Sequence, residues 1–145
     1  IESDLICEYL VERYGQANRG LSLYPAGDLV QHKQRLAIMN GGMAAGVKLI
    51  RAKRSGLSWD YPFFRQEEAS LKASLDWLER DLDGRNFYGE EALSLLEITL
   101  QCFLEWALFR EMVPSLDPYP NLARFAAFHR QRPSFAMTHP SREAQ

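Results

Sequence analysis

Two adjacent polar residues near the start of the chain have side chains that could bind a small zwitterion. Glu2 and Ser3 precede an apolar stripe of helical spacing, which predicts a helix to about Tyr14 with Ser3 as its N-cap. The open N–H groups and the dipole of a helix N-terminus attract anions. Ser3 could therefore bind a carboxylate while Glu2 binds an ammonium group. A serine at an N-cap needs no ligand, so a purely structural role is the alternative.

Four apolar side chains are a second candidate for ligand contact. They lie in apolar helical stretches, where packing in the core is the ordinary role: Met39, Met43, Trp106 and Phe109. The alternative is that they line a pocket for a small apolar molecule.

The helix that contains these methionines has four basic residues near its C-terminal end: Lys48, Arg51, Lys53 and Arg54. Cations at a helix C-terminus are stabilised by the dipole, so a solvated basic end is the simpler interpretation. Binding of an anion there is the alternative.

The sequence has no recognisable catalytic or metal-binding motif. It lacks a glycine-rich phosphate loop, metal-spaced ligands and a nucleophile elbow. His32, His129 and His139 have no partners nearby in sequence, which favours structural or surface roles. Cys7 and Cys102 lie in apolar helical patterns, which indicates buried thiols in a reducing cytosol. We therefore predict a cytoplasmic protein without a metal and without a catalytic residue in this chain.

The strongest helix signal covers residues 94 to 112. Ser94 and Glu97 form a capping box, in which the serine hydroxyl accepts from the N–H of residue 97 and the carboxylate accepts from the N–H of residue 94. The residues that follow are apolar on nearly every side, yet they lack the roughly 18 uninterrupted apolar residues of a membrane span. We predict that this helix is the buried centre of a helical bundle.

The rest of the chain divides into three parts. Residues 1–14 form the opening helix, 15–27 read as a linker with glycine and proline breakers, and 28–145 form a helical domain. Asp28 caps a helix to about Lys53, and no convincing strand appears. The sequence thus predicts an all-α fold. Because the chain opens directly on an apolar stripe, we expect a fragment whose first helix packs on a part that is missing.

The helix from Asp28 contains three glycines in its interior, and each lowers the stability of the helix by about 1 kcal/mol relative to alanine. They are Gly41, Gly42 and Gly46. Close approach of a neighbouring helix, or of a ligand, is the physical reason to place them there, and close packing is the simpler of the two.

Composition limits the partners. With 145 residues, 46% of them hydrophobic and 25% charged, the chain is one ordinary globular domain in size. A net charge of -2 argues against a nucleic acid or an anionic membrane held by bulk charge.

Several short segments resemble, in order and spacing, the C-terminal part of bacterial cytosolic glutathione S-transferases. They are Glu2-Ser3-Asp4-Leu5-Ile6, Leu23-Tyr24-Pro25, the capping box from Ser94 to Glu97, Tyr119-Pro120-Asn121-Leu122 and Arg132-Pro133-Ser134-Phe135. The resemblance covers essentially the whole chain. It implies a glutathione S-transferase C-terminal-like bundle around the central helix (94 to 112). Residues 1–14 would then be the last helix of a truncated thioredoxin-like domain.

The resemblance also implies roles for particular residues. Glu2 and Ser3 would bind the γ-glutamyl end of glutathione, which is the co-substrate. Met39, Met43 and Trp106 would line the site of a small electrophilic substrate, between the missing domain and the helical bundle. The activating residue would lie in the missing domain, so the chain alone should be inert.

Partners follow from the same resemblance. It implies a homodimer across a surface that includes the helices from Asp28 and Phe63. The alternative is a non-catalytic module of the same fold that binds a protein partner. The family usually has aspartate where this chain has Glu97 and alanine where it has Leu96. Glutamate still completes a capping box, so the departure concerns local packing rather than folding.

Overall fold

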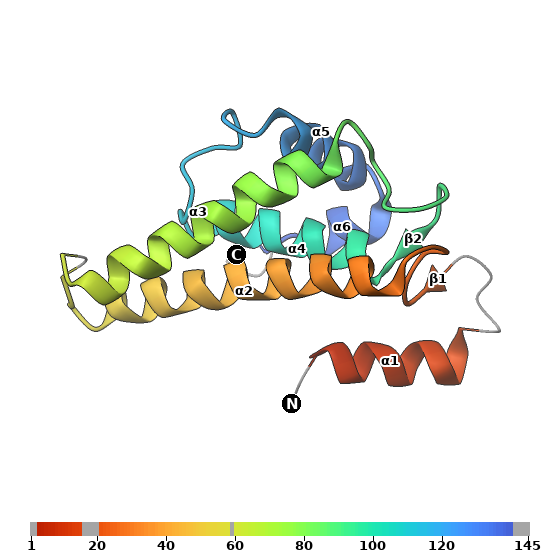
Figure 1. The fold of residues 1–145 in the computed structure, drawn as a ribbon, viewed down its shortest axis with the longest axis horizontal. Coiled ribbons are helices and arrows are strands. Elements are labelled where there is room, and N and C mark those ends of the chain that lie inside the picture. The colour runs from red at the N-terminus through yellow and green to blue at the C-terminus, as the bar shows by residue number, and fades with distance from the viewer. Residues whose placement is uncertain (1–2, 16–20, 59, 141–145) are drawn as a thin grey trace.

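The computed structural model describes residues 3–15, 21–58 and 60–140 as a helical bundle with one additional helix beside it. Its helices and strands, in chain order, are α1 (Ser3–Tyr14), β1 (Leu21–Ser22), α2 (Leu29–Arg54), α3 (Pro62–Leu82), β2 (Leu93–Ser94), α4 (Leu95–Phe109), α5 (Pro120–Arg130) and α6 (Pro133–Met137). In Figure 1, α2 and α3 form a long antiparallel pair, α4 lies alongside them, and α1 stands apart beneath α2. The prediction of an all-α fold is confirmed.

The core forms around α4, as the apolar sequence of that helix predicts. The fully buried side chains of α4 include Leu96, Leu100, Phe103, Leu104 and Ala107. They pack on leucines that recur at helical spacing along α3 and on residues of α2 and α5. Because α4 is covered on most sides by protein, its apolar residues need no membrane.

The capping box at the start of α4 is present. The Leu96 N–H donates to Ser94 Oγ at 3.2 Å, and the Ser94 N–H donates to Glu97 Oε2 at 2.7 Å. The Ser94 hydroxyl also donates to Glu97, and the Tyr88 N–H donates to the other carboxylate oxygen at 2.7 Å. The fully buried carboxylate of Glu97 therefore joins the start of α4 to the loop that precedes it.

The prediction that this helix extends to Met112 is wrong by about one turn. α4 ends at Phe109 because Glu111 adopts a left-handed backbone conformation, with φ of 56°. The N–H groups of Glu111 and Met112 then donate back to Leu108 O at 3.0 Å and Ala107 O at 2.8 Å. This pattern satisfies carbonyls at a helix C-terminus and turns the chain away.

The absence of strands is also a wrong prediction. β1 and β2 pair in parallel, with Leu21 opposite Leu93 and Ser22 opposite Ser94. The Leu95 N–H continues the contact by donating to Leu23 O at 3.2 Å. Two residues are too few to show the alternation that identifies a strand, so only tertiary pairing reveals it. The pairing fixes the end of the linker to the start of α4.

Two of the three helical glycines allow close packing. A Cβ on Gly42 would lie 2.8 Å from Phe103 Cζ, and one on Gly46 would lie 2.9 Å from Trp106 Cζ3. A Cβ on Gly41 would meet nothing within 4 Å. Close approach of α4 to α2 therefore accounts for Gly42 and Gly46.

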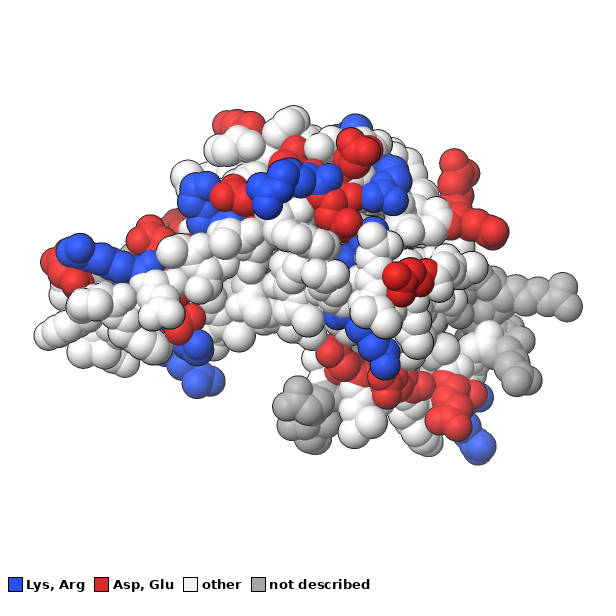
Figure 2. All heavy atoms as spheres, viewed as in Figure 1, with Lys and Arg blue, Asp and Glu red and all other residues white. Residues whose placement is uncertain are grey.

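The surface of α1 is divided into two kinds of side chain. Leu5, Ile6, Tyr9 and Leu10 are exposed, with Leu5 65% and Tyr9 59% accessible. In Figure 2, acidic side chains run along α1 on the viewed face, whereas acidic and basic side chains alternate over the bundle.

No helix within the described ranges is both long and apolar enough to cross a bilayer.

The two cysteine side chains are more exposed than the sequence predicts. Cys102 is exposed and Cys7 is partly buried. Cys102 is one of the exposed residues of α4, which the sequence pattern of an all-round apolar helix does not reveal.

The capping box gives a direct test of this fold. Ser94→Ala should lower the free energy of unfolding by about 1 kcal/mol, because the cap at the start of α4 is lost. Chemical denaturation measures the change. Ser70→Ala, at an exposed serine of α3, is the matched control and should stay within about 0.5 kcal/mol. An unchanged denaturation midpoint for Ser94→Ala would contradict the role of the cap.

Candidate functional site

The predicted zwitterion site lies at the first turn of α1. Ser3 is exposed and is the first helical residue, whereas the sequence predicts it as the N-cap. The bounds of a helix shift by a residue when its first turn is irregular, so Ser3 still lies where backbone N–H groups are open. Glu2 lies outside the described residues. The joint role of Glu2 and Ser3 therefore stays a prediction.

A hydrogen bond that the sequence analysis misses holds this turn against the bundle. The side-chain amide of Asn40, in the middle of α2, donates to Asp4 Oδ2 at 2.9 Å. Asp4 directly follows Ser3, so the bond fixes the turn that carries Ser3. In the sequence, the signal for this bond is that a polar residue, Asn40, directly precedes the small residues of α2.

The linker end packs beside the same turn. The Tyr24 ring stacks on His32 with the ring centroids 6.4 Å apart and the planes nearly parallel. Burial raises the pKa of the Tyr24 phenol, and the nearby carboxylates of Glu8 and Asp4 raise it further. Tyr24 thus stays a neutral anchor between α1 and α2.

The three side chains predicted to line an electrophile site differ in how deeply they are buried. Met39 is fully buried in the core, and Met43 is partly buried and packs against it. Trp106 lines a pocket of about 170 Å³ between α2 and α4, together with Val47 and Ile50. Of the predicted set, Trp106 therefore lines a pocket formed by described residues, and Met39 belongs to the core.

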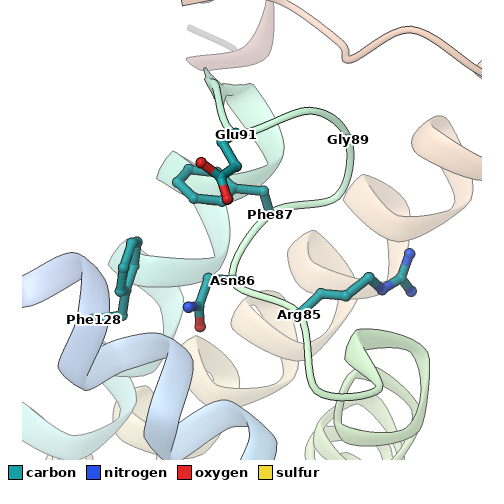
Figure 3. Close-up of a pocket in the computed structure, with 6 residues that line it drawn as sticks. All are labelled: Arg85, Asn86, Phe87, Gly89, Glu91 and Phe128. Atoms are coloured by element: carbon teal, nitrogen blue, oxygen red, sulfur yellow. The ribbon is translucent and has the colours of Figure 1, made fainter.

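A second pocket of about 450 Å³ lies beside the loop that precedes α4. Figure 3 shows the rings of Phe87 and Phe128 on one side of this pocket and the Arg85 side chain pointing away from them. Arg85 Nε donates to Leu82 O at 3.1 Å, and Nη2 donates to Asp81 O. Because the guanidinium already satisfies the C-terminal carbonyls of α3, this pocket has little left with which to bind an anion.

A histidine of α5 anchors the loop that precedes α4 on its buried side. His129 Nε2 lies 2.7 Å from Asn86 O, and the ring packs against aromatic neighbours that include Phe125 and Phe135. A carbonyl can only accept, so Nε2 must carry the proton. Burial lowers the pKa of His129, which keeps the ring neutral. Its role is structural, as the sequence predicts.

Comparison with known families identifies the fold. A family model described as the C-terminal domain of glutathione S-transferase matches residues 44–127, more than half of the chain. The chain belongs to this family. No curated protein sequence matches it.

Solved structures of bacterial glutathione S-transferases share the arrangement of this domain. One from Methylobacterium radiotolerans, in complex with glutathione sulfonate, is 21% identical with a TM-score of 0.81 over 97% of this chain. One from Methylobacillus flagellatus with GSH bound is 26% identical, with a TM-score of 0.82 over 97% of this chain. One from Actinobacillus pleuropneumoniae is 21% identical, with a TM-score of 0.71 over 94%. The chain spans 66%, 69% and 60% of those chains, respectively.

Charged groups inside this glutathione S-transferase domain form a buried cluster. Arg35 Nε donates to Asp81 Oδ2 at 2.7 Å and Nη2 to Oδ1 at 3.1 Å, with the side chains 3% and 13% exposed. The guanidinium lies over the Tyr88 ring, 4.7 Å from its centroid, and Nη1 donates to His32 Nδ1 at 3.2 Å. Burial raises the pKa of Tyr88, so the phenol stays neutral.

The ion pair of this cluster is satisfied internally, whereas Tyr88 Oη and His32 Nε2 are buried without a hydrogen-bond partner among the described residues. The bidentate ion pair satisfies both charges and joins α2 to α3. In the described part of the chain no group of three or more histidine, cysteine, aspartate or glutamate side chains could hold a metal ion. The ion pair therefore fixes α2 against α3 within the glutathione S-transferase domain.

Removal of one partner tests this role. Arg35→Met should destabilise the domain by about 3–5 kcal/mol, because the Asp81 carboxylate is left without its partner. Lys48→Met breaks the Lys48–Glu67 pair, in which the lysine is 51% exposed, and should cost less than about 1 kcal/mol. Thermal and chemical denaturation compare the two variants. Equal losses of stability would contradict a special role for the buried pair.

Proposed function

We propose that the intact protein conjugates glutathione to small electrophiles and that this chain supplies part of both substrate sites. In this proposal the turn that carries Ser3 binds the γ-glutamyl end of glutathione, with Glu2 on its ammonium group. The proposal is carried by the Asn40–Asp4 hydrogen bond, which fixes that turn against the bundle. Family membership and the glutathione ligands of similar bacterial structures support it.

The thiol-activating group must come from outside this chain. Conjugation requires a donor that stabilises the glutathione thiolate and so lowers the pKa of the thiol. No residue of the chain is assigned that role. The exposed apolar side chains of α1, Leu5, Ile6 and Leu10 among them, fit a helix that packs on a preceding domain. We therefore assign the catalytic residue to that domain and expect this chain alone to be inert.

Binding of glutathione tests the proposal. Isothermal titration of the intact protein should show binding, and Ser3→Ala should weaken it about tenfold or more through loss of a hydrogen bond to a charged group. Asn40→Ala should weaken it less, because Asn40 acts only through Asp4. Ser70→Ala, far from the turn, should bind as the unaltered protein does.

The outcomes separate the alternatives. No heat at millimolar glutathione would exclude the assignment of Ser3. Binding without any conjugation of an activated electrophile would favour the non-catalytic module that binds a protein partner.

We also propose that the intact protein is a homodimer across the α2–α3 pair. Large apolar side chains are exposed near both ends of this pair: Leu29, Val30, Leu57, Tyr61 and Phe63. Exposed large apolar side chains at each end of one pair of helices fit an interface along that pair.

Sedimentation analysis tests the dimer. The intact protein should sediment as a dimer, and Phe63→Glu should shift it toward the monomer because a charge enters the apolar interface. Phe128→Glu, at an exposed phenylalanine of α5, is the matched control and should leave the dimer intact. A monomeric unaltered protein would contradict the proposal.

A further inference from the structure

The C-terminal ends of α2 and α4 border two adjoining pockets. Their volumes are about 170 and 380 Å³, and they share Ile50, Arg54 and Arg110. The remaining lining residues come from the same two helix ends: Val47, Arg51 and Trp106 in the smaller pocket, and Lys53, Phe109, Glu111 and Met112 in the larger one.

The charge around these pockets is positive. Arg51, Arg54 and Arg110 form no ion pair with any acidic side chain of the described residues. With Lys53 they make four cations against one carboxylate, that of Glu111. Two helix C-termini contribute about half a negative charge each, so the region keeps a net charge of about +2. The helix dipoles alone therefore do not neutralise it.

One part of the lining of the smaller pocket is apolar. Trp106 is partly buried, with its indole packed against Gly46, and Ile50 and Val47 lie beside it. Arg110 lies over Phe109 with its guanidinium carbon 5.0 Å from the ring centroid. An indole wall with arginines at the rim suits a molecule with an aromatic body and an acidic group.

The pocket lies on the side of α2 that also holds α1. Residues 40, 47, 51 and 54 are spaced by seven, four and three, which places them along one stripe of a helix. Val47 lies roughly 10 Å along the α2 axis from Asn40, at 1.5 Å per residue. The pocket and the turn that Asn40 holds therefore lie along the same side of α2.

We propose that this pocket receives the electrophile and selects aromatic electrophiles that carry a carboxylate or sulfonate group. The aromatic body packs against Trp106, and Arg51, Arg54 and Arg110 bind the acidic group. This inference rests on the proposed function for the reaction. The recognition of an aromatic anion can be tested without it.

Binding of two fluorescent dyes tests the recognition in the intact protein. 8-Anilinonaphthalene-1-sulfonate and N-phenyl-1-naphthylamine share one ring system and differ by the sulfonate. The double variant Arg54→Gln/Arg110→Gln should weaken binding of the sulfonate dye about tenfold, through loss of charge-assisted hydrogen bonds. Binding of the neutral dye should change less than about twofold. The double variant Arg65→Gln/Arg80→Gln removes two exposed arginines of α3 and is the control for the change in net charge.

Turnover tests the selection of substrates. With glutathione, the thiolate displaces chloride from 4-chloro-3-nitrobenzoate or from neutral 1-chloro-2,4-dinitrobenzene, forming a C–S bond as the C–Cl bond breaks. The double variant should raise KM for the benzoate about tenfold and leave KM for the neutral substrate nearly unchanged.

The results test the proposed function and the anion site separately. Absent turnover and absent glutathione binding would overturn the proposed function, whereas loss of sulfonate dye binding in the double variant would still support an anion site. Unchanged affinity for the sulfonate dye, or an equal loss for both dyes, would overturn the inference. Circular dichroism confirms that each variant retains its helices.

Discussion

The arrangement of the bundle depends on one buried carboxylate. Glu97 is fully buried, and its oxygens accept from the N–H groups of Ser94 and Tyr88 and from the Ser94 hydroxyl. A buried charge is costly unless donors replace the lost water, and these donors replace it. The same contacts decide where α4 starts and how the preceding loop returns to it. The pairing of β1 with β2 follows, because Ser94 belongs to both features.

Small residues decide how closely the helices approach this centre. Gly42 lets the Phe103 ring reach the α2 backbone, and Gly46 does the same for the Trp106 indole. The indole therefore packs against α2 at Gly46, and part of the side chain stays accessible. The packing that fills the core near Phe103 thus also forms the wall of a pocket near Trp106. Glu111, with its left-handed backbone, follows the end of α4 beside the basic end of α2 and lines the adjoining larger pocket.

α1 is attached to this glutathione S-transferase domain in a different way. One polar link is the Asn40–Asp4 bond, and many large apolar side chains of α1 are exposed. A helix with such a surface is stable only when another element covers it, since isolated short helices are marginal in water. The turn that carries Ser3 is thus held from one side by α2. Its orientation matters more than its burial for the proposed binding of glutathione.

The sequence alone determined the local features, because caps and helical periodicity depend on residues a few positions apart. The Ser94–Glu97 box, the Asp28 cap and the leucine spacing of α3 were all predictable in this way. The tertiary structure decided what depends on distant residues. The Asn40–Asp4 bond joins positions far apart in the chain, and the two-residue strands have no periodicity of their own. Which of Met39, Met43 and Trp106 reached a pocket was likewise a matter of packing, since all three look alike as apolar helix residues.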